Sequence, residues 1–128
     1  MAETEKITIN LSVVDLGRID LLVDQGHFSN RTDLIRNAIR MKLNSYEASI
    51  ETVVASKNMA IGVLIYSKSN LKKFLAKNKM LEISMMGMLS FSKDITPELA
   101  LAVVKSIKVY GVFNASPEVK AALADRIL

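Results

Sequence analysis

Three polar side chains near the start of the chain alternate with three apolar ones, in an arrangement that can meet the base edges of DNA. The polar residues are Lys6, Thr8 and Asn10, and the apolar residues are Ile7, Ile9 and Leu11. A period of two places the two sets on opposite faces of a β-strand. The major groove of B-DNA admits a two-stranded β-ribbon, and lysine, threonine and asparagine can hydrogen-bond to base edges there. The sequence therefore predicts a strand over 6–11 with one hydrogen-bonding face and one apolar face.

A strand of this length needs a partner. Six residues cannot by themselves bury one face and pair both edges, and no second strand of this kind follows nearby. The same strand of a second chain would supply the missing partner, which predicts a two-stranded ribbon in a homodimer. The alternative interpretation is that the polar residues form the solvent face of an ordinary edge strand.

Two helices are expected after this strand. Ser12 is a suitable N-cap with Asp15 three residues on, and Gly26 ends a helix over about 13–25. Ser29 and Asn30 both suit the start of a second helix. Its apolar spacing continues without glycine or proline to about residue 56, so 47–58 is expected to be a helical connector that continues the second helix.

The order of strand, capped helix, glycine turn and second helix resembles the ribbon–helix–helix family of DNA-binding proteins (the MetJ/Arc/CopG class). The resemblance rests on segments 7–11 and 26–40 and covers about residues 5–46. It implies a homodimer that inserts an antiparallel ribbon into the major groove of double-stranded DNA. The residues that it places in contact with bases are Lys6, Thr8 and Asn10. Those that it places near phosphates are Ser29, Asn30 and Arg31. Those that it places in the intertwined dimer core are Ile7, Ile9, Leu11, Leu16, Ile19, Leu34, Ile35, Ala38 and Ile39.

The remainder of the chain has a different pattern. Gly62, Gly87 and Gly111 are 25 and 24 residues apart, and each precedes apolar residues and then a helix-like stretch. Ser or Thr followed by Pro and Glu, at 96–98 and 116–118, marks two strong helix starts. A strand and a helix that recur at this period indicate a short α/β repeat, similar to a solenoid. The alternative is a small βαβαβα sheet domain in which the glycine spacing is accidental.

The expected fold is therefore an α+β ribbon–helix–helix dimer over 1–46, a connector over 47–58 and an α/β repeat domain over 59–128. For the last domain we expect self-assembly into tetramers or longer arrays, or binding of a protein partner or a small effector. Its final strand is apolar and could be an open edge.

The charge of the chain gives little support by itself to DNA binding. The formal net charge is +4, but residues 1–46 hold six basic and six acidic side chains. A DNA contact there must depend on local placement. For Arg36 and Arg40 two interpretations stay open: a solvated helix face, which includes an ion pair with Asp33, or a contact with DNA. The lysines at 68, 72, 73, 77 and 79 form either a solvated face or a contact to flanking DNA.

Motifs of catalysis and metal binding are missing from the sequence. Cysteine is absent and His27 is the single histidine, so neither a thiol nucleophile nor an ordinary zinc site is available. Neither Gly-x-Ser-x-Gly nor the phosphate-loop motif occurs. We expect no enzyme activity, no cofactor and no metal. With no secretory leader and no apolar run long enough for a membrane span, the expected location is cytoplasmic.

The function expected from the sequence is sequence-specific DNA binding, as a transcriptional repressor. One alternative is a DNA-anchored structural protein, such as a partition or relaxosome-like assembly. Another is an antitoxin whose C-terminal part binds a partner protein, although such parts are commonly disordered when free and 58–128 is apolar and patterned.

Overall fold

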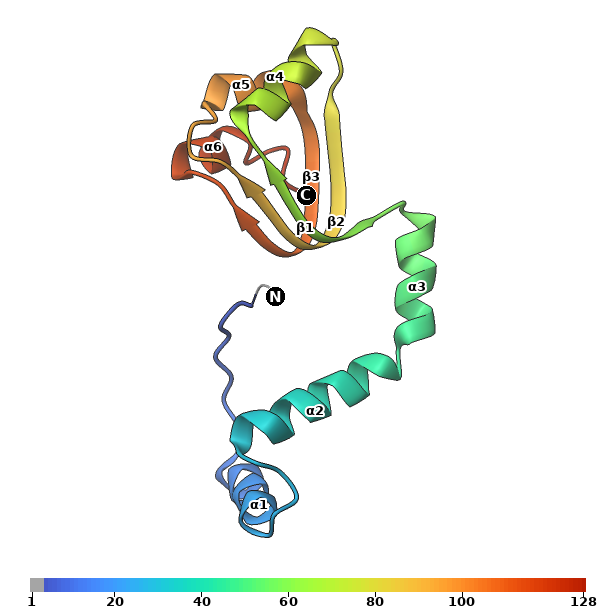
Figure 1. The fold of residues 1–128 in the computed structure, drawn as a ribbon, viewed down its shortest axis with the longest axis vertical. Coiled ribbons are helices and arrows are strands. Elements are labelled where there is room, and N and C mark those ends of the chain that lie inside the picture. Colours follow the sequence, from blue (N-terminus) through green and yellow to red (C-terminus); the bar gives the residue numbers. More distant parts are fainter. Residues whose placement is uncertain (1–3) are drawn as a thin grey trace. The chain divides into compact units, whose positions relative to one another are not determined.

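The computed structural model describes residues 4–128 as a mixture of helices and strands (Figure 1). The helices are α1 (Val13–Asp24), α2 (Arg31–Asn44), α3 (Glu47–Ser56), α4 (Lys68–Ala76), α5 (Pro97–Val103) and α6 (Pro117–Ala122). The strands are β1 (Ala60–Tyr66), β2 (Leu81–Phe91) and β3 (Val104–Asn114). The chain divides into two compact units, one over Lys6–Val53 and one that includes Val54–Leu128. The division falls inside α3, within the predicted connector.

Helices α1 and α2 of the first unit begin where their capping residues predict. The Ser12 hydroxyl accepts a hydrogen bond from the Asp15 N–H at 3.1 Å, and the Asn30 side chain accepts one from the Asp33 N–H at 2.8 Å. Each cap satisfies an N–H that the first helical turn leaves without a backbone partner. Gly26, at φ +84°, takes the left-handed conformation that reverses the chain after α1.

The strand predicted over 6–11 is not formed in the single chain. Residues 4–12 have no regular secondary structure. The apolar residues Ile7, Ile9 and Leu11 are 74, 58 and 44% exposed. A strand exists only when its N–H and C=O groups bond to a neighbouring strand, and one chain offers no such neighbour to this segment.

The prediction of one continuous helix from residue 30 to about 56 is wrong. α2 ends at Asn44 and α3 begins at Glu47. At the break, the Ser45 hydroxyl donates to the Lys42 carbonyl oxygen at 2.6 Å, and the Tyr46 N–H bonds to the Leu43 carbonyl. The apolar spacing continues through this turn, so helical spacing alone does not reveal it.

The second unit is built on a parallel sheet in the order β1-β2-β3. Side chains from all three of its helices join one core with the inward residues of the strands. Its fully buried members include Leu71, Met85, Leu89, Val103, Ile107, Val119 and Leu123. Because these residues form a single cluster, α4, α5 and α6 cover the same side of the sheet (Figure 1). Among residues 4–128, the second unit holds the only cluster of buried apolar side chains.

The three strands bend where three glycines lie side by side. Gly62 pairs with Gly87 and Gly87 with Gly111, at φ values of +125°, +134° and +129°. A Cβ on Gly87 would lie 2.0 Å from the Gly62 carbonyl oxygen, and one on Gly111 would lie 2.1 Å from that of Gly87. Glycine is therefore needed both for the backbone conformation and for the close approach of the strands. The spacing of the three glycines therefore follows from the register of the strands and is not accidental.

The glycine row makes a prediction about stability. Gly87→Ala should lower the urea midpoint of the second unit more than Gly62→Ala does, measured by far-ultraviolet circular dichroism. Both substitutions impose backbone strain of about 1–3 kcal/mol. Only the first adds a methyl group against a neighbouring carbonyl, because a Cβ on Gly62 meets nothing within 4 Å. Equal midpoints for the two variants would contradict the close packing of the row.

Candidate nucleic-acid interface

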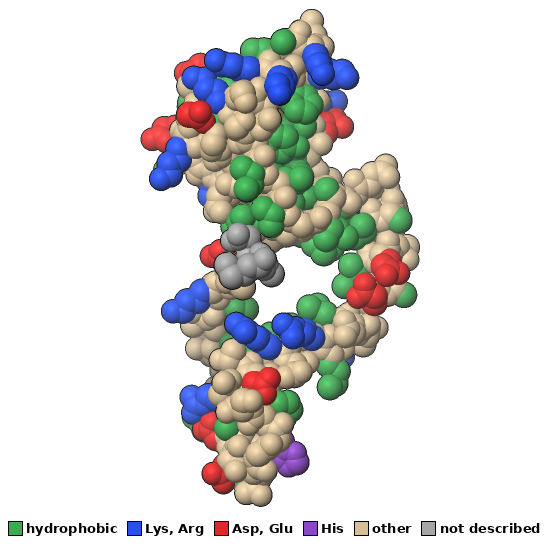
Figure 2. All heavy atoms as spheres, in the orientation of Figure 1, with side chains coloured by type: hydrophobic (Ala, Val, Ile, Leu, Met, Phe, Trp, Pro, Cys, Tyr) green, Lys and Arg blue, Asp and Glu red, His purple; other side chains and the backbone are tan. Residues whose placement is uncertain are grey.

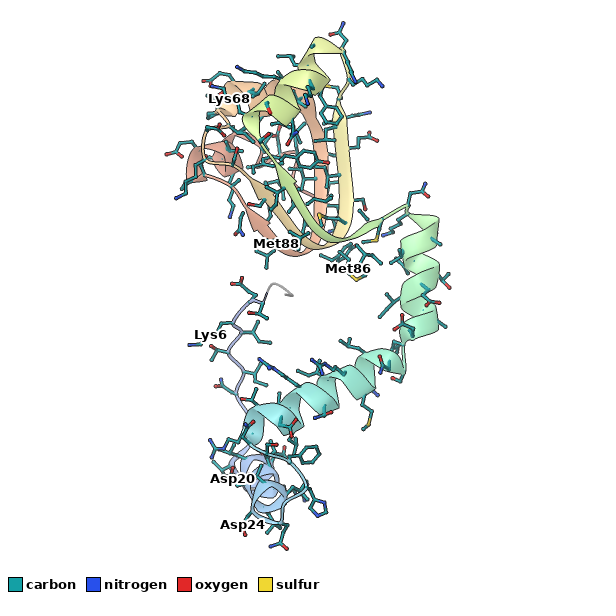
Figure 3. The ribbon with its side chains drawn as sticks, in the orientation of Figure 1. Lys6, Asp20, Asp24, Lys68, Met86 and Met88 are labelled. Atoms are coloured by element: carbon teal, nitrogen blue, oxygen red, sulfur yellow. The ribbon has the colours of Figure 1, made fainter. Side chains whose placement is uncertain are left out.

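The three predicted base-reading side chains are exposed and close together in sequence, ahead of α1. Lys6, Thr8 and Asn10 all lie in the segment without regular structure. Figure 3 shows the Lys6 side chain projecting away from the backbone of this segment. Within residues 4–128, none of the three forms a side-chain hydrogen bond or a salt bridge with another residue. They are therefore accessible to an external partner, but the single chain does not hold them in a fixed array.

The apolar side chains of the first unit are poorly covered. None of the residues of α1, α2 or α3 is buried. The predicted dimer-core residues Leu16, Ile19, Leu34 and Ile35 are only partly buried, Ala38 is exposed and Ile39 is 46% exposed. An apolar groove runs between α1 and α2, with Leu22, Phe28, Leu34, Ala38 and Met41 in its lining. The unit thus lacks an interior of its own.

A carboxylate of the chain itself lies beside the N-terminus of α2, which is predicted to meet a phosphate. Asp33 accepts a hydrogen bond from the Ser29 N–H at 3.0 Å, and its own N–H donates to the Asn30 side chain. The Asn37 amide also donates to the Asp33 carboxylate at 3.0 Å. Asn30 is therefore the N-cap of α2, and the backbone N–H of Ser29 is bound by Asp33. The N–H groups of Arg31 and Thr32, in the first turn, are the ones that α2 leaves without an intrahelical acceptor.

Arg31 is held by an ion pair. Its Nε and Nη2 atoms donate to the two carboxylate oxygens of Asp20 at 2.7 and 2.8 Å, which links α2 to α1. The hydrogen bonds from Arg31, with its positive charge, lower the pKa of the Asp20 carboxyl, against a smaller opposing effect of burial. The pKa of Arg31 is raised by the same contact. In this conformation, Arg31 positions the two helices and does not project as an unpaired phosphate ligand.

Arg36 and Arg40 are better placed for an anion. They lie one helical turn apart on the exposed side of α2 and line a shallow hollow with Thr32, Asp33 and Asn37. In the part of the chain that the structure describes, neither arginine forms a salt bridge, and Asp33 is engaged by the cap instead of by Arg36. The sequence had left the role of these arginines open. Their position beside the start of α2 is the information that it lacked.

Other kinds of site find no support in the residues described. Among residues 4–128, no group of three or more His, Asp or Glu side chains could hold a metal ion. None of the helices described is both long enough and apolar enough to cross a membrane.

The Arg31–Asp20 pair predicts a specific dependence on pH. Because the pKa of Asp20 is lowered on folding, the pair stabilises the first unit fully above the ordinary carboxyl pKa, and this contribution is lost as the pH falls through the lowered value. Arg31→Gln should raise the pKa of Asp20 towards its ordinary value in a carboxyl titration followed by NMR. Arg36→Gln, which removes an exposed arginine from the same helix, should leave it unchanged. An Asp20 pKa that is the same with and without Arg31 would rule out the ion pair in solution.

Comparison with known proteins extends the resemblance beyond the first unit. The model of the Ribbon-Helix-Helix transcriptional regulator family matches residues 2–120, so the limit of the resemblance at residue 46 was too narrow. An uncharacterized protein of Archaeoglobus fulgidus is 30% identical over 53 residues, which are 41% of this chain and 88% of that protein. No solved structure is significantly similar to the chain. Ribbon–helix–helix proteins bind DNA, typically as dimers. Since the match includes most of both units, this chain belongs to the ribbon–helix–helix transcriptional regulator family.

Proposed function

We propose that the protein is a homodimeric transcriptional repressor that reads a specific DNA site with a two-stranded antiparallel ribbon. The observation that supports this most is the state of segment 6–11 in one chain. It alternates polar and apolar residues, exposes both sets and has no strand beside it. A second copy of the same segment supplies the missing hydrogen-bonding partner.

Pairing across a two-fold axis would bury the apolar face of the ribbon. Ile7, Ile9 and Leu11 would lie against the uncovered apolar side chains of α1 and α2 from both chains. Each such side chain contributes about 1.5–3 kcal/mol when it is fully buried. The absence of any buried residue in the helices of the first unit is what a chain that completes its core through a partner would show.

The opposite face of the ribbon would carry two copies of Lys6, Thr8 and Asn10 into the major groove. Asparagine can form a bidentate pair with adenine, lysine can donate to the O6 and N7 atoms of guanine, and threonine can contact the thymine methyl group or a polar edge. A good bidentate pair contributes about 1–3 kcal/mol of discrimination between bases. The two-fold axis would require a site with two similar half-sites.

Phosphate contacts would fix the ribbon in the groove. The first turn of α2 offers the N–H groups of Arg31 and Thr32, and Arg36 and Arg40 line the hollow beside it. Because the first 46 residues carry six basic and six acidic side chains, these few contacts supply the attraction in place of a general positive field. A dimer that occupies its site in this way excludes other proteins from the same groove, and this is the means of repression that we propose.

The first test separates base reading from general binding. Sites selected from random DNA by the unmodified protein should be footprinted at two salt concentrations. Thr8→Ala and Asn10→Ala should lose about 1–3 kcal/mol of preference for the selected site over altered sites. Thr52→Ala, a matched change in α3, should retain the preference. If Thr8→Ala and Asn10→Ala keep the full site preference, the assignment of these residues is wrong.

The second test uses the two faces of the predicted ribbon. Ile9→Ala should weaken the dimer by at least about a hundredfold, because loss of a buried isoleucine costs about 2–5 kcal/mol in each chain. The adjacent Thr8→Ala should leave the dimer intact, since Thr8 lies on the other face. Sedimentation equilibrium over a range of protein concentrations measures both. An unchanged dissociation constant for Ile9→Ala would show that this segment is outside the dimer interface.

A further inference from the structure

Strand β1 is an edge of the sheet in the second unit and carries no charged residue. Its side chains Ile61, Val63 and Ile65 are 69, 47 and 67% exposed. Half of the backbone N–H and C=O groups of an edge strand point away from its neighbour in the sheet. Stable proteins protect such an edge with charged side chains, proline, a bulge or a covering segment. In the residues described, β1 has none of these protections.

The opposite edge of the same sheet is treated differently. At β3, the Ile107 N–H donates to the Arg126 carbonyl at 2.9 Å, and the Leu128 N–H donates to the Ile107 carbonyl at 2.8 Å. The Arg126 guanidinium donates to the carbonyls of Leu101 and Val104, both at 2.7 Å, which fixes this covering segment. β3 also carries Lys105 and Lys108. One edge is therefore partly covered and charged, whereas the other is open and apolar.

An apolar band on the side of the sheet away from the helices runs up to the open edge. The register places Ile61, Met86 and Tyr110 in one row, and Val63, Met88 and Val112 in the next. Figure 3 shows Met86 and Met88 at the bend of the sheet, and Figure 2 shows hydrophobic side chains gathered in this part of the unit. At β1 the band stops without a border of polar residues. A strand added beside β1 would continue it.

Gly62 also leaves space at the outer edge of β1. The positions that a Cβ would take on Gly87 and Gly111 are filled by the carbonyl of the preceding strand in the sheet, whereas the same position on Gly62 is empty. The backbone of β1 can therefore be approached closely from its outer side. This supports a backbone partner at β1.

We infer that β1 pairs, antiparallel and about a two-fold axis, with β1 of a second copy of this chain, so that the two sheets join into one. The pairing is like with like because the β3 edge is partly covered, and because a two-fold contact closes while a head-to-tail contact continues indefinitely. Edge pairing alone buries little surface. The dimer of the proposed function, on which this step rests, would raise the effective concentration of one β1 near the other.

Single cysteines in the full chain test this pairing, since the natural sequence contains none. Ile61→Cys, Val63→Cys and Ile65→Cys sample the possible registers, and a short bismaleimide serves as the cross-linker. Residues on the axis of an antiparallel pair face their own copies at about 4.5–5.5 Å between Cβ atoms. We expect one of the three variants to give a strong covalent dimer on a denaturing gel. Val112→Cys, on the same side of the sheet but on β3, should give none.

Two results would overturn the inference. One is the absence of a covalent dimer from all three variants, with circular dichroism showing that they are folded. The other is cross-linking of Val63→Cys mixed with Val112→Cys when neither links alone, which indicates head-to-tail stacking. The DNA-site assay on the same proteins separates this inference from the proposed function. Retained site preference without cross-linking refutes the β1 pairing alone, whereas cross-linking without DNA binding refutes the proposed function alone.

Discussion

The need of every strand for a hydrogen-bonding neighbour governs both units of this protein. A backbone N–H or C=O group without a partner loses free energy when it leaves water, so a strand forms only beside another strand. In the second unit, β2 lies between two neighbours, and its residues Met85 and Leu89 are fully buried. In the first unit, segment 6–11 has no neighbour and remains irregular. The same requirement explains why the β1-β2-β3 sheet forms, why segment 6–11 is irregular in a single chain and why the outer edge of β1 lacks a partner.

The two units also differ in how they bury apolar side chains. The second unit closes its core within one chain, because three helices pack on one side of a sheet bent at Gly62, Gly87 and Gly111. The helices of the first unit bury none of their residues, although their apolar spacing is regular. In our proposal a second chain completes the first unit, and stability and DNA recognition then depend on the same contact. A regulator built in this way binds its site only as an assembled dimer.

The charged contacts within the first unit mainly fix the positions of its helices and add little to the attraction of DNA. Asp20 binds Arg31, and the Asp33 carboxylate, in the first turn of α2, accepts a hydrogen bond from the Ser29 N–H. These carboxylates cancel part of the positive charge that DNA would meet. Arg36 and Arg40 lie beyond them on the exposed side of α2. The balance of charge in the first 46 residues therefore reflects a local division between acids that fix the helices and arginines that remain accessible.

The sequence by itself determined the features that depend on neighbours in the chain. The caps at Ser12 and Asn30, the turn at Gly26 and the helix starts at Thr96 and Ser116 were all readable, because capping and glycine turns involve residues only a few positions apart. The family was readable from the same local order.

The tertiary structure decided what depends on distant residues. Arg31 is bound by a carboxylate eleven positions earlier, the covered edge at Ile107 depends on the chain's last residues, and the glycine row requires three strands in register. The break at Ser45 is hidden for another reason, because the apolar spacing continues through it. Periodicity reports which face a residue occupies, but only the folded chain shows which groups meet across that face.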